Sequence, residues 1–223
     1  MTQNDKVKIY DNEVIEPLDA AHSIIQTSDG YRFGEDAVAL GKFACDYIKR
    51  GDAVIDLCSG CGIVGIIVEI ERSAEVLGGD IDEKACDMAN RSALLNGLSA
   101  RFYKVDVRDK AALKAAFGSV KASAVTVNPP FYKAKSKPSK VAPEASSELT
   151  VTFGDIAAAA RTLLKPRGEF FAVHTSSRLD EVLCICRDNK LTPKNLVINK
   201  NGKTFLLRCV LGGGDGLTVS IKE

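Results

Sequence analysis

The chain has 223 residues, a net charge of +1 and 45% hydrophobic residues, which is enough apolar material for the core of one domain. The near-neutral charge excludes a uniformly basic nucleic-acid-binding protein, so any site for a polyanion must be a local patch. No apolar run approaches the length of a membrane span, and the polar start MTQNDKVKIYDNE is unlike a signal peptide, so we expect a cytoplasmic protein with no membrane partner.

The first 50 residues carry a weak strand pattern followed by one helix. Val14-Ile15 and Ile24-Ile25-Gln26 predict two short strands, and the turn signal Ser28-Asp29-Gly30 predicts a small hairpin over residues 24–33. Apolar residues at helical spacing predict a helix over residues 35–49. We therefore expect an N-terminal extension at 1–50, followed by the main domain at 51–223.

From residue 53 onward, predicted strands and helices alternate. Strands are predicted at 53–57, 75–79, 100–105, 122–127, 169–174, 192–198 and 204–211. Helices are predicted at 62–70, 83–96, 109–116, 153–165 and 177–188, with a long loop at 132–150. This alternation predicts an α/β fold with a Rossmann-like, doubly wound, mostly parallel sheet. The last two strands have no helix between them, which predicts an antiparallel C-terminal pair.

A glycine-rich turn follows the strand at 53–57. The segment VIDLCSGCGIVG, residues 54–65, has the pattern D-x-x-x-G-x-G-x-x-G, with glycines at 60, 62 and 65. Glycines let the backbone approach a ligand closely, and the start of the following helix offers free N–H groups. The turn alone is weak support for a nucleotide site, and the residues at the following strand ends strengthen it.

Four consecutive predicted strands each end in a polar residue, namely Asp56, Asp80, Asp106 and Asn128. Because ligands of open α/β sheets bind at the carboxyl ends of the strands, we expect these side chains to converge. Asp80 can accept hydrogen bonds from both hydroxyls of a ribose, Asp106 can accept from an adenine amino group, and Asp56 can receive an ammonium. The set suits a nucleoside with a cationic tail better than a nucleotide with phosphates.

The sequence Asn128-Pro129-Pro130-Phe131 is the most specific motif. Its two prolines fix the backbone directly after a strand, so the Asn128 side chain and the Pro129 carbonyl can accept hydrogen bonds from a planar amine. Such acceptors stabilise the positive charge that develops as the amine becomes tetrahedral. Phe131 offers a ring that can stack on a base.

Taken together, these stretches resemble the class I S-adenosylmethionine-dependent methyltransferases with an Asn-Pro-Pro-Phe motif. The chain is most similar to the bacterial family that methylates N6 of an adenine in the anticodon loop of valine tRNA. The similarity covers nearly the whole chain and rests on residues 26–37, 56–62, 88–97, 128–131 and 212–217. It implies the class I methyltransferase fold, S-adenosylmethionine as cofactor and tRNA as substrate, with no metal.

The resemblance also assigns roles to residues. It places Asp56 and Gly60 along the methionine part of the cofactor, Asp80 at the ribose, and Asp106 with Val107 at the adenine. It implies that Asn128 and Pro129 hold the target amine and that Phe131 stacks on the base. Pro130 completes the catalytic motif. The implied cofactor-binding set is Tyr31, Arg32, Phe33, Asp36, Asp56, Gly60, Gly62, Asp80, Ile81, Asp106, Val107 and Asn128. The first four of these, in the segment 1–50, are implied to cap the cofactor pocket. One departure is Asp80, where the family often carries Glu.

Two alternative functions remain open at this level. One is a methyltransferase that acts on an adenine of ribosomal RNA or DNA, or on a protein glutamine amide, although enzymes of the last kind usually present Tyr where this chain has Phe131. The other is a nucleotide-binding module or a dinucleotide oxidoreductase, which the motif disfavours because hydride transfer does not use amine acceptors.

Other polar residues have weaker assignments. Four lysines follow the motif, and we expect them to contact RNA phosphates: Lys133, Lys135, Lys137 and Lys140. Cys58 and Cys61 form a C-x-x-C, but no second pair and only two histidines, His22 and His174, accompany it, so we expect free thiols and not a zinc site. No feature of the sequence indicates an oligomeric state.

Overall fold

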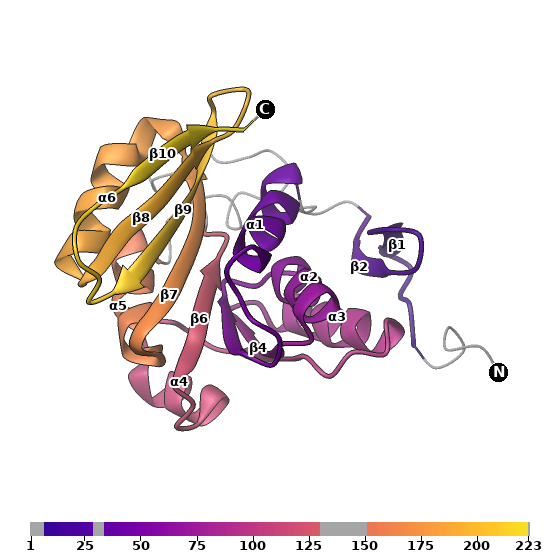
Figure 1. The fold of residues 1–223 in the computed structure, drawn as a ribbon. Helices are drawn as coiled ribbons and strands as arrows, with labels where there is room; N and C mark the ends of the chain where they lie inside the picture. The colour runs from indigo at the N-terminus through magenta and orange to yellow at the C-terminus, as the bar shows by residue number, and fades with distance from the viewer. Residues whose placement is uncertain (1–6, 29–33, 130–150, 223) are drawn as a thin grey trace.

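The computed structural model describes residues 7–28, 34–129 and 151–222, and a twisted eight-stranded sheet forms its centre (Figure 1). The strands of that sheet are β3 (Ala53–Leu57), β4 (Glu75–Asp80), β5 (Arg101–Lys104), β6 (Ala122–Val127), β7 (Leu164–Thr175), β8 (Leu191–Ile198), β9 (Thr204–Leu211) and β10 (Thr218–Ile221). The helices are α1 (Glu35–Cys45), α2 (Ile63–Arg72), α3 (Glu83–Leu95), α4 (Lys110–Phe117), α5 (Phe153–Leu163) and α6 (Leu179–Asp188), with a short 3-10 turn η2 (Ser176–Arg178).

The strand order β10-β8-β9-β7-β6-β3-β4-β5 confirms the predicted fold class. Strands β3 to β7 pair in parallel, whereas β9 runs antiparallel to both β7 and β8. Successive strands move outward from β3 in one direction to β5 and then continue at β6 on its other side. This reversal is the topological switch point at which open α/β sheets bind ligands.

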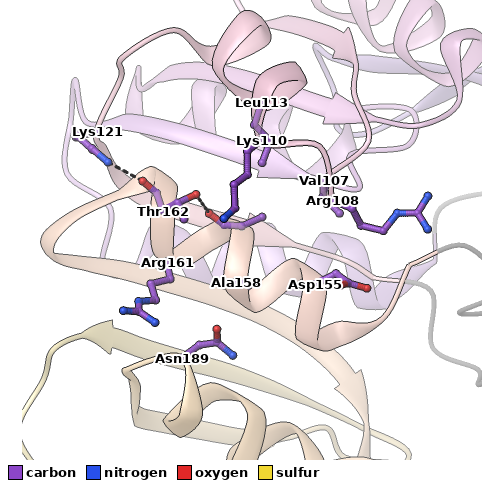
Figure 2. A pocket seen from close by; sticks show the side chains of 11 residues that line it. Val107, Arg108, Lys110, Leu113, Lys121, Asp155, Ala158, Arg161, Thr162 and Asn189 are labelled. Atoms are coloured by element: carbon purple, nitrogen blue, oxygen red, sulfur yellow. Dashed lines mark hydrogen bonds between the residues drawn. The ribbon is translucent and has the colours of Figure 1, made fainter.

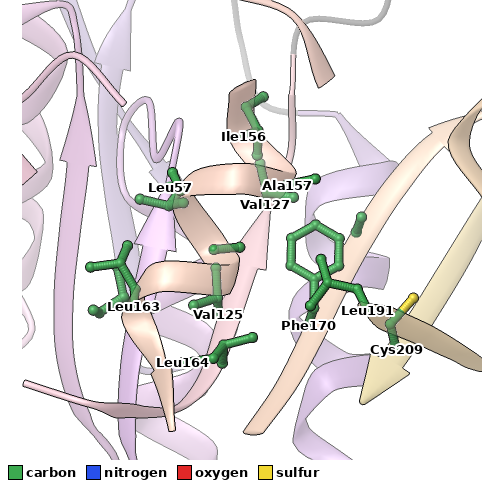
Figure 3. Close-up of a cluster of buried hydrophobic side chains, with 14 of the residues drawn as sticks. Leu57, Val125, Val127, Ile156, Ala157, Leu163, Leu164, Phe170, Leu191 and Cys209 are labelled. Atoms are coloured by element: carbon green, nitrogen blue, oxygen red, sulfur yellow. The ribbon is translucent and has the colours of Figure 1, made fainter. Parts of the chain in front are cut away.

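Both faces of the sheet are covered by helices, because the apolar side chains of each strand alternate between them. Ile55 and Val125 face α4, α5 and α6, and Figure 3 shows Val125 beside Leu163 of α5 in this cluster. Val54 and Ala124 face the opposite cluster, which α1, α2 and α3 complete. The continuous apolar runs of these strands therefore have a packing partner on each side.

Side-chain caps fix where several helices begin. Asp82 accepts a hydrogen bond from the backbone of Lys84 at the start of α3, and Asp109 accepts two at the start of α4. Thr152 and Asp155 form a reciprocal capping box at the start of α5. These caps pair N–H groups that a helix terminus otherwise leaves unsatisfied.

The N-terminal hairpin differs from the prediction. Strands β1 (Glu13–Pro17) and β2 (Ser23–Thr27) pair with each other, so the hairpin spans 13–27 and not 24–33. Asp19 closes its turn by accepting backbone hydrogen bonds from Ala21 and His22. The turn signal at 28–30 follows the hairpin, and residues 29–33 lie outside the described part of the chain.

Two further differences concern strand limits. The predicted helix 153–165 ends at Leu163, and β7 begins at once with Leu164. The pairing of β6 with β7 shifts register between Ala122 and Ala124, and Arg167 has φ +65°. This irregularity lets β7 include Pro166 and Gly168. The strand β10, which pairs with β8, was not predicted; it is only four residues long and all four are exposed.

Candidate active site at the carboxyl edge of the sheet

The predicted polar strand ends meet at one edge of the sheet. Parallel pairing of β6, β3, β4 and β5 aligns their carboxyl ends, and the register sets Leu57 opposite both Gly79 and Val127. Asp80 follows Gly79 at the end of β4, and Asn128 follows Val127 at the end of β6. The two residues therefore flank the glycine turn on either side. Asp56 lies one residue before Leu57, inside the sheet.

The glycine turn is held in a left-handed backbone conformation. Cys58, Gly60 and Gly62 have φ of +53°, +52° and +81°. A side chain at Gly62 would meet Ala89 and Phe102 at 2.8 Å, whereas one at Gly60 would find nothing within 4 Å. Gly62 is therefore required for packing, and Gly60 faces open space where a ligand can approach the backbone.

Asp56 is buried beneath this turn. Its two carboxylate oxygens accept hydrogen bonds from Thr126 Oγ1 at 2.7 Å and from the Gly65 amide at 3.1 Å. Burial raises the pKa of Asp56 to about 7. The carboxyl group thus links β3 to β6 and to the start of α2, and contact with an ammonium of a ligand stays a prediction.

Asp80 is oriented by two backbone amides. Its Oδ2 accepts from Gly60 at 2.8 Å and its Oδ1 accepts from Asp82 at 3.0 Å. Each carboxylate oxygen retains a further lone pair, so the group can still accept two hydroxyl donors. Burial raises the pKa of Asp80. The next side chain, Ile81, is 49% exposed and gives the site an apolar wall.

Asp106 forms an ion pair that the sequence analysis missed. Arg108 donates from Nε and Nη2 to the two carboxylate oxygens at 2.9 and 2.6 Å. The guanidinium lowers the pKa of Asp106, which is therefore ionised and a strong acceptor. Val107 between them is buried against the core. The acid-x-Arg spacing was the available signal for this pair.

Asn128 holds an unpaired buried atom. Its Oδ1 is shielded from solvent and has no hydrogen-bond partner within the described ranges, and the same is true of Ser59 Oγ in the glycine turn. An unpaired buried acceptor costs about 1–3 kcal/mol, so Oδ1 of Asn128 is a candidate acceptor for a donor from outside the described residues. Pro129 is buried beside it, and Pro130 and Phe131 lie outside the described residues.

Comparison with protein families agrees with this geometry. Residues 42–183 match the model of the methyltransferase small domain family. The chain belongs to this family.

Three curated relatives extend the comparison. The uncharacterized RNA methyltransferase YljE of Lactococcus lactis is 36% identical over 37% of this chain, and a ribosomal protein L11 methyltransferase of Thermotoga neapolitana is 24% identical over 48%. The matches cover only 18% and 44% of those two proteins, so the chain spans less than half of their length. The tRNA1(Val) (adenine(37)-N6)-methyltransferase of Bacteroides fragilis is 25% identical over 77% of this chain and 72% of that protein.

Solved structures confirm the methyltransferase fold. A predicted O-methyltransferase, Atu636 of Agrobacterium tumefaciens, superposes with a TM-score of 0.64 at 18% identity, covering 83% of this chain and 85% of that one. SMU.776, a putative methyltransferase complexed with SAH, gives a TM-score of 0.64 at 11% identity, with 91% and 57% covered. At these identities the likeness shows the fold alone.

Within this methyltransferase domain, Asp36 performs a structural task. Its Oδ1 accepts hydrogen bonds from Asn199 Nδ2 at 3.0 Å and Thr204 Oγ1 at 2.7 Å. These bonds tie the start of α1 to the turn between β8 and β9. The predicted cofactor contacts Tyr31, Arg32 and Phe33, and the lysines at 133, 135, 137 and 140, lie outside the described residues.

The cysteines and histidines contribute no assembled site. Burial raises the pKa of Cys61 to about 12 and that of Cys58 well above the usual thiol value. Within residues 7–28, 34–129 and 151–222, no group of three or more candidate side chains could hold a metal ion. His174 is buried between Phe153 and Phe205, and burial lowers its pKa to about 4. No described helix is long and apolar enough to span a bilayer.

Proposed function

We propose that this chain transfers the methyl group of S-adenosylmethionine to the N6 amine of an adenine in RNA, with the anticodon loop of valine tRNA as its substrate. The unpaired Oδ1 of Asn128 carries the proposal, because a buried acceptor at the end of β6 suits an amine substrate. Membership of the methyltransferase family supports methyl transfer. The relative named for tRNA1(Val) adenine-N6 methylation, matched over 77% of this chain, supports the substrate.

The residues at the carboxyl edge fit the cofactor. The open space at Gly60 admits a ligand against the backbone of the turn. The free lone pairs of Asp80 suit ribose hydroxyls, and the ionised Asp106 suits an adenine amino group, with Ile81 and Val107 as apolar neighbours. S-adenosylmethionine supplies a methyl group activated by a positively charged sulfur. In this proposal, residues 1–50 cap the cofactor, with Tyr31, Arg32, Phe33 and Asp36 at the cap.

Asn128 and Pro129 would hold the target amine. The exocyclic nitrogen of adenine is a poor nucleophile because its lone pair is delocalised into the ring. Oxygen acceptors that bind both of its hydrogens favour the tetrahedral form and stabilise its developing positive charge. Phe131 would stack on the base, which must leave its own stack to reach this edge. Lys133, Lys135, Lys137 and Lys140 would contact phosphates next to the motif.

A second candidate substrate is a protein. The similarity to ribosomal protein L11 methyltransferases favours it, although the match covers 48% of this chain and so less than the match to the tRNA enzyme. Its target nitrogen would occupy the same acceptors at Asn128 and Pro129. The two candidates differ in which macromolecule becomes labelled.

The deciding experiment measures methyl transfer from labelled S-adenosylmethionine to separated pools of tRNA, ribosomal RNA, DNA and protein. The pools come from a strain that lacks this gene, and labelled nucleosides are then identified. We expect label in tRNA as N6-methyladenosine. Label in protein would support the second candidate, and a bound cofactor with no labelled pool would contradict both.

A further inference from the structure

A basic groove lies on the sheet face that carries α4, α5 and α6. It has a volume of about 710 Å³ and is lined by Val107, Arg108, Lys110, Leu113, Lys121, Asp155, Ala158, Ala159, Arg161, Thr162 and Asn189. Figure 2 shows Lys110 reaching from the α4 side toward α5, with Arg161 and Lys121 at the same groove. Four of the lining side chains are cationic and one is acidic, in a chain whose net charge is only +1.

Most of this positive charge is not neutralised by the residues that the structure describes. Neither Lys110 nor Arg161 forms an ion pair with any described residue, and both are exposed. Lys121 donates to the backbone carbonyl of Thr162. Asp155, the acidic lining residue, accepts hydrogen bonds from Thr152 in the capping box of α5. Three cations are therefore available to a ligand, while Arg108 is already paired with Asp106.

The groove begins at the candidate active site. Its Val107–Arg108 end adjoins Asp106 at the carboxyl edge of the sheet, and it continues along α5 toward Thr162 and Asn189. The 11 residues of α5 extend over roughly 16 Å, enough for several phosphates of a nucleic-acid strand. No aromatic residue of the described ranges lines the groove, so its described lining offers charge without a surface for stacking bases.

We infer that this groove binds the sugar–phosphate backbone of the RNA substrate beside the nucleotide that enters the active site. This inference rests on the proposed RNA substrate. Lysine and arginine side chains bind phosphates without reading sequence, so the groove positions the RNA, and the acceptors at Asn128 and Pro129 select the base. Binding through the groove must weaken with salt, because each neutralised phosphate releases counterions.

Ala158 offers a direct test, because it is an exposed residue of α5 within the groove. Ala158→Glu places a carboxylate one helical turn before Arg161 without removing a hydrogen bond, and glutamate is well tolerated in helices. Ala158→Gln adds a side chain of similar size and no charge. We expect the glutamate variant to raise the Kd for a valine tRNA transcript about tenfold or more at low salt, and the glutamine variant to bind like the unaltered protein.

A second pair of variants tests the charges themselves. Lys110→Gln with Arg161→Gln spares Lys121 and Arg108, which have structural partners. The matched control is Lys42→Gln with Arg50→Gln, two exposed cations: Lys42 lies in α1, on the opposite face of the sheet, and Arg50 lies in the turn that follows α1. We expect the groove pair to flatten the slope of log Kd against log salt by about 1.5 to 2, and the control pair to leave it unchanged.

The readouts separate this inference from the proposed function. S-adenosylmethionine affinity and the thermal midpoint are measured for every variant, and the groove pair decides the matter if Ala158→Glu fails to fold. Unchanged tRNA affinity and salt slope in the groove variants would overturn the inference, as would equal losses in the control pair. The proposed function is judged separately, by whether the unaltered protein methylates tRNA at N6 of adenine.

Discussion

The backbone N–H of Gly60 donates a hydrogen bond to Oδ2 of Asp80 across 2.8 Å, which ties the glycine turn after β3 to the end of β4. Two features of the proposed cofactor site, the open backbone of the turn and the acceptor at the next strand, are thus held in one fixed arrangement. A second bond, from the Asp82 amide to Oδ1, fixes the other carboxylate oxygen. The carboxylate is preorganised for a ligand that carries hydroxyl donors.

Asp80→Ala should weaken S-adenosylmethionine binding. The variant removes the acceptor for two ribose hydroxyls, and a hydrogen bond to a charged group contributes about 1.5–3 kcal/mol, so we expect a loss of at least about tenfold in affinity. Isothermal calorimetry measures it directly. Asp80→Asn keeps one acceptor oxygen, so its affinity for S-adenosylmethionine should lie between those of the unaltered protein and Asp80→Ala. An unchanged Kd in Asp80→Ala would show that the cofactor lies elsewhere.

Gly60→Ala and Gly62→Ala should separate ligand binding from stability. Both residues have positive φ, which costs a non-glycine residue about 1–2 kcal/mol. The methyl group at position 62 would also meet Ala89 and Phe102 at 2.8 Å, so Gly62→Ala should lose clearly more free energy of unfolding in urea titrations. Gly60→Ala should lose mainly cofactor affinity, since its methyl group points into open space. Equal effects of the two variants on both quantities would contradict this division.

The sequence predicted the sheet and the strand-end positions because both follow from local patterns. Buried parallel strands read as apolar runs such as Val54-Ile55, and topology then aligns their ends. The hairpin was misplaced because a turn signal such as Ser28-Asp29-Gly30 does not say which neighbouring segment pairs. The edge strand β10 has only four residues, Thr218–Ile221, and so short an alternation is a weak strand signal.

The sequence could not show which side chains from distant segments meet at the site. The bond between Thr126 and Asp56 joins residues 70 positions apart, and only the register of β3 and β6 makes it possible. The basic groove is likewise assembled from separate segments: Lys110 begins α4, Lys121 precedes β6 and Arg161 lies in α5. No single stretch of sequence marks it as a patch.

Asp56 should make stability depend on pH. Its pKa is raised to about 7 by burial, above the value of about 3.9 for an exposed aspartate. The folded state therefore retains a proton that the unfolded chain releases, and this contribution to stability is fully present below about pH 4 and is lost as the pH rises through about 7. Between these limits, we expect the free energy of unfolding of the native protein to fall with pH relative to that of Asp56→Asn, in urea titrations. Parallel profiles would contradict the raised pKa.

Asn128→Ala should slow methyl transfer strongly while leaving the fold and the cofactor site intact. Oδ1 of Asn128 has no partner in the described part of the chain, so its removal breaks no hydrogen bond there and the thermal midpoint should not fall through a lost bond. If that oxygen stabilises the charge on the target amine, its loss should lower kcat by about 10²–10³-fold, as for other preorganised groups of this kind. Single-turnover methylation of valine tRNA measures the rate, and calorimetry with S-adenosylmethionine provides the control. A variant that binds the cofactor and methylates at the native rate would exclude Asn128 from the chemistry. One that loses cofactor binding as well would place the residue at the cofactor and not at the amine.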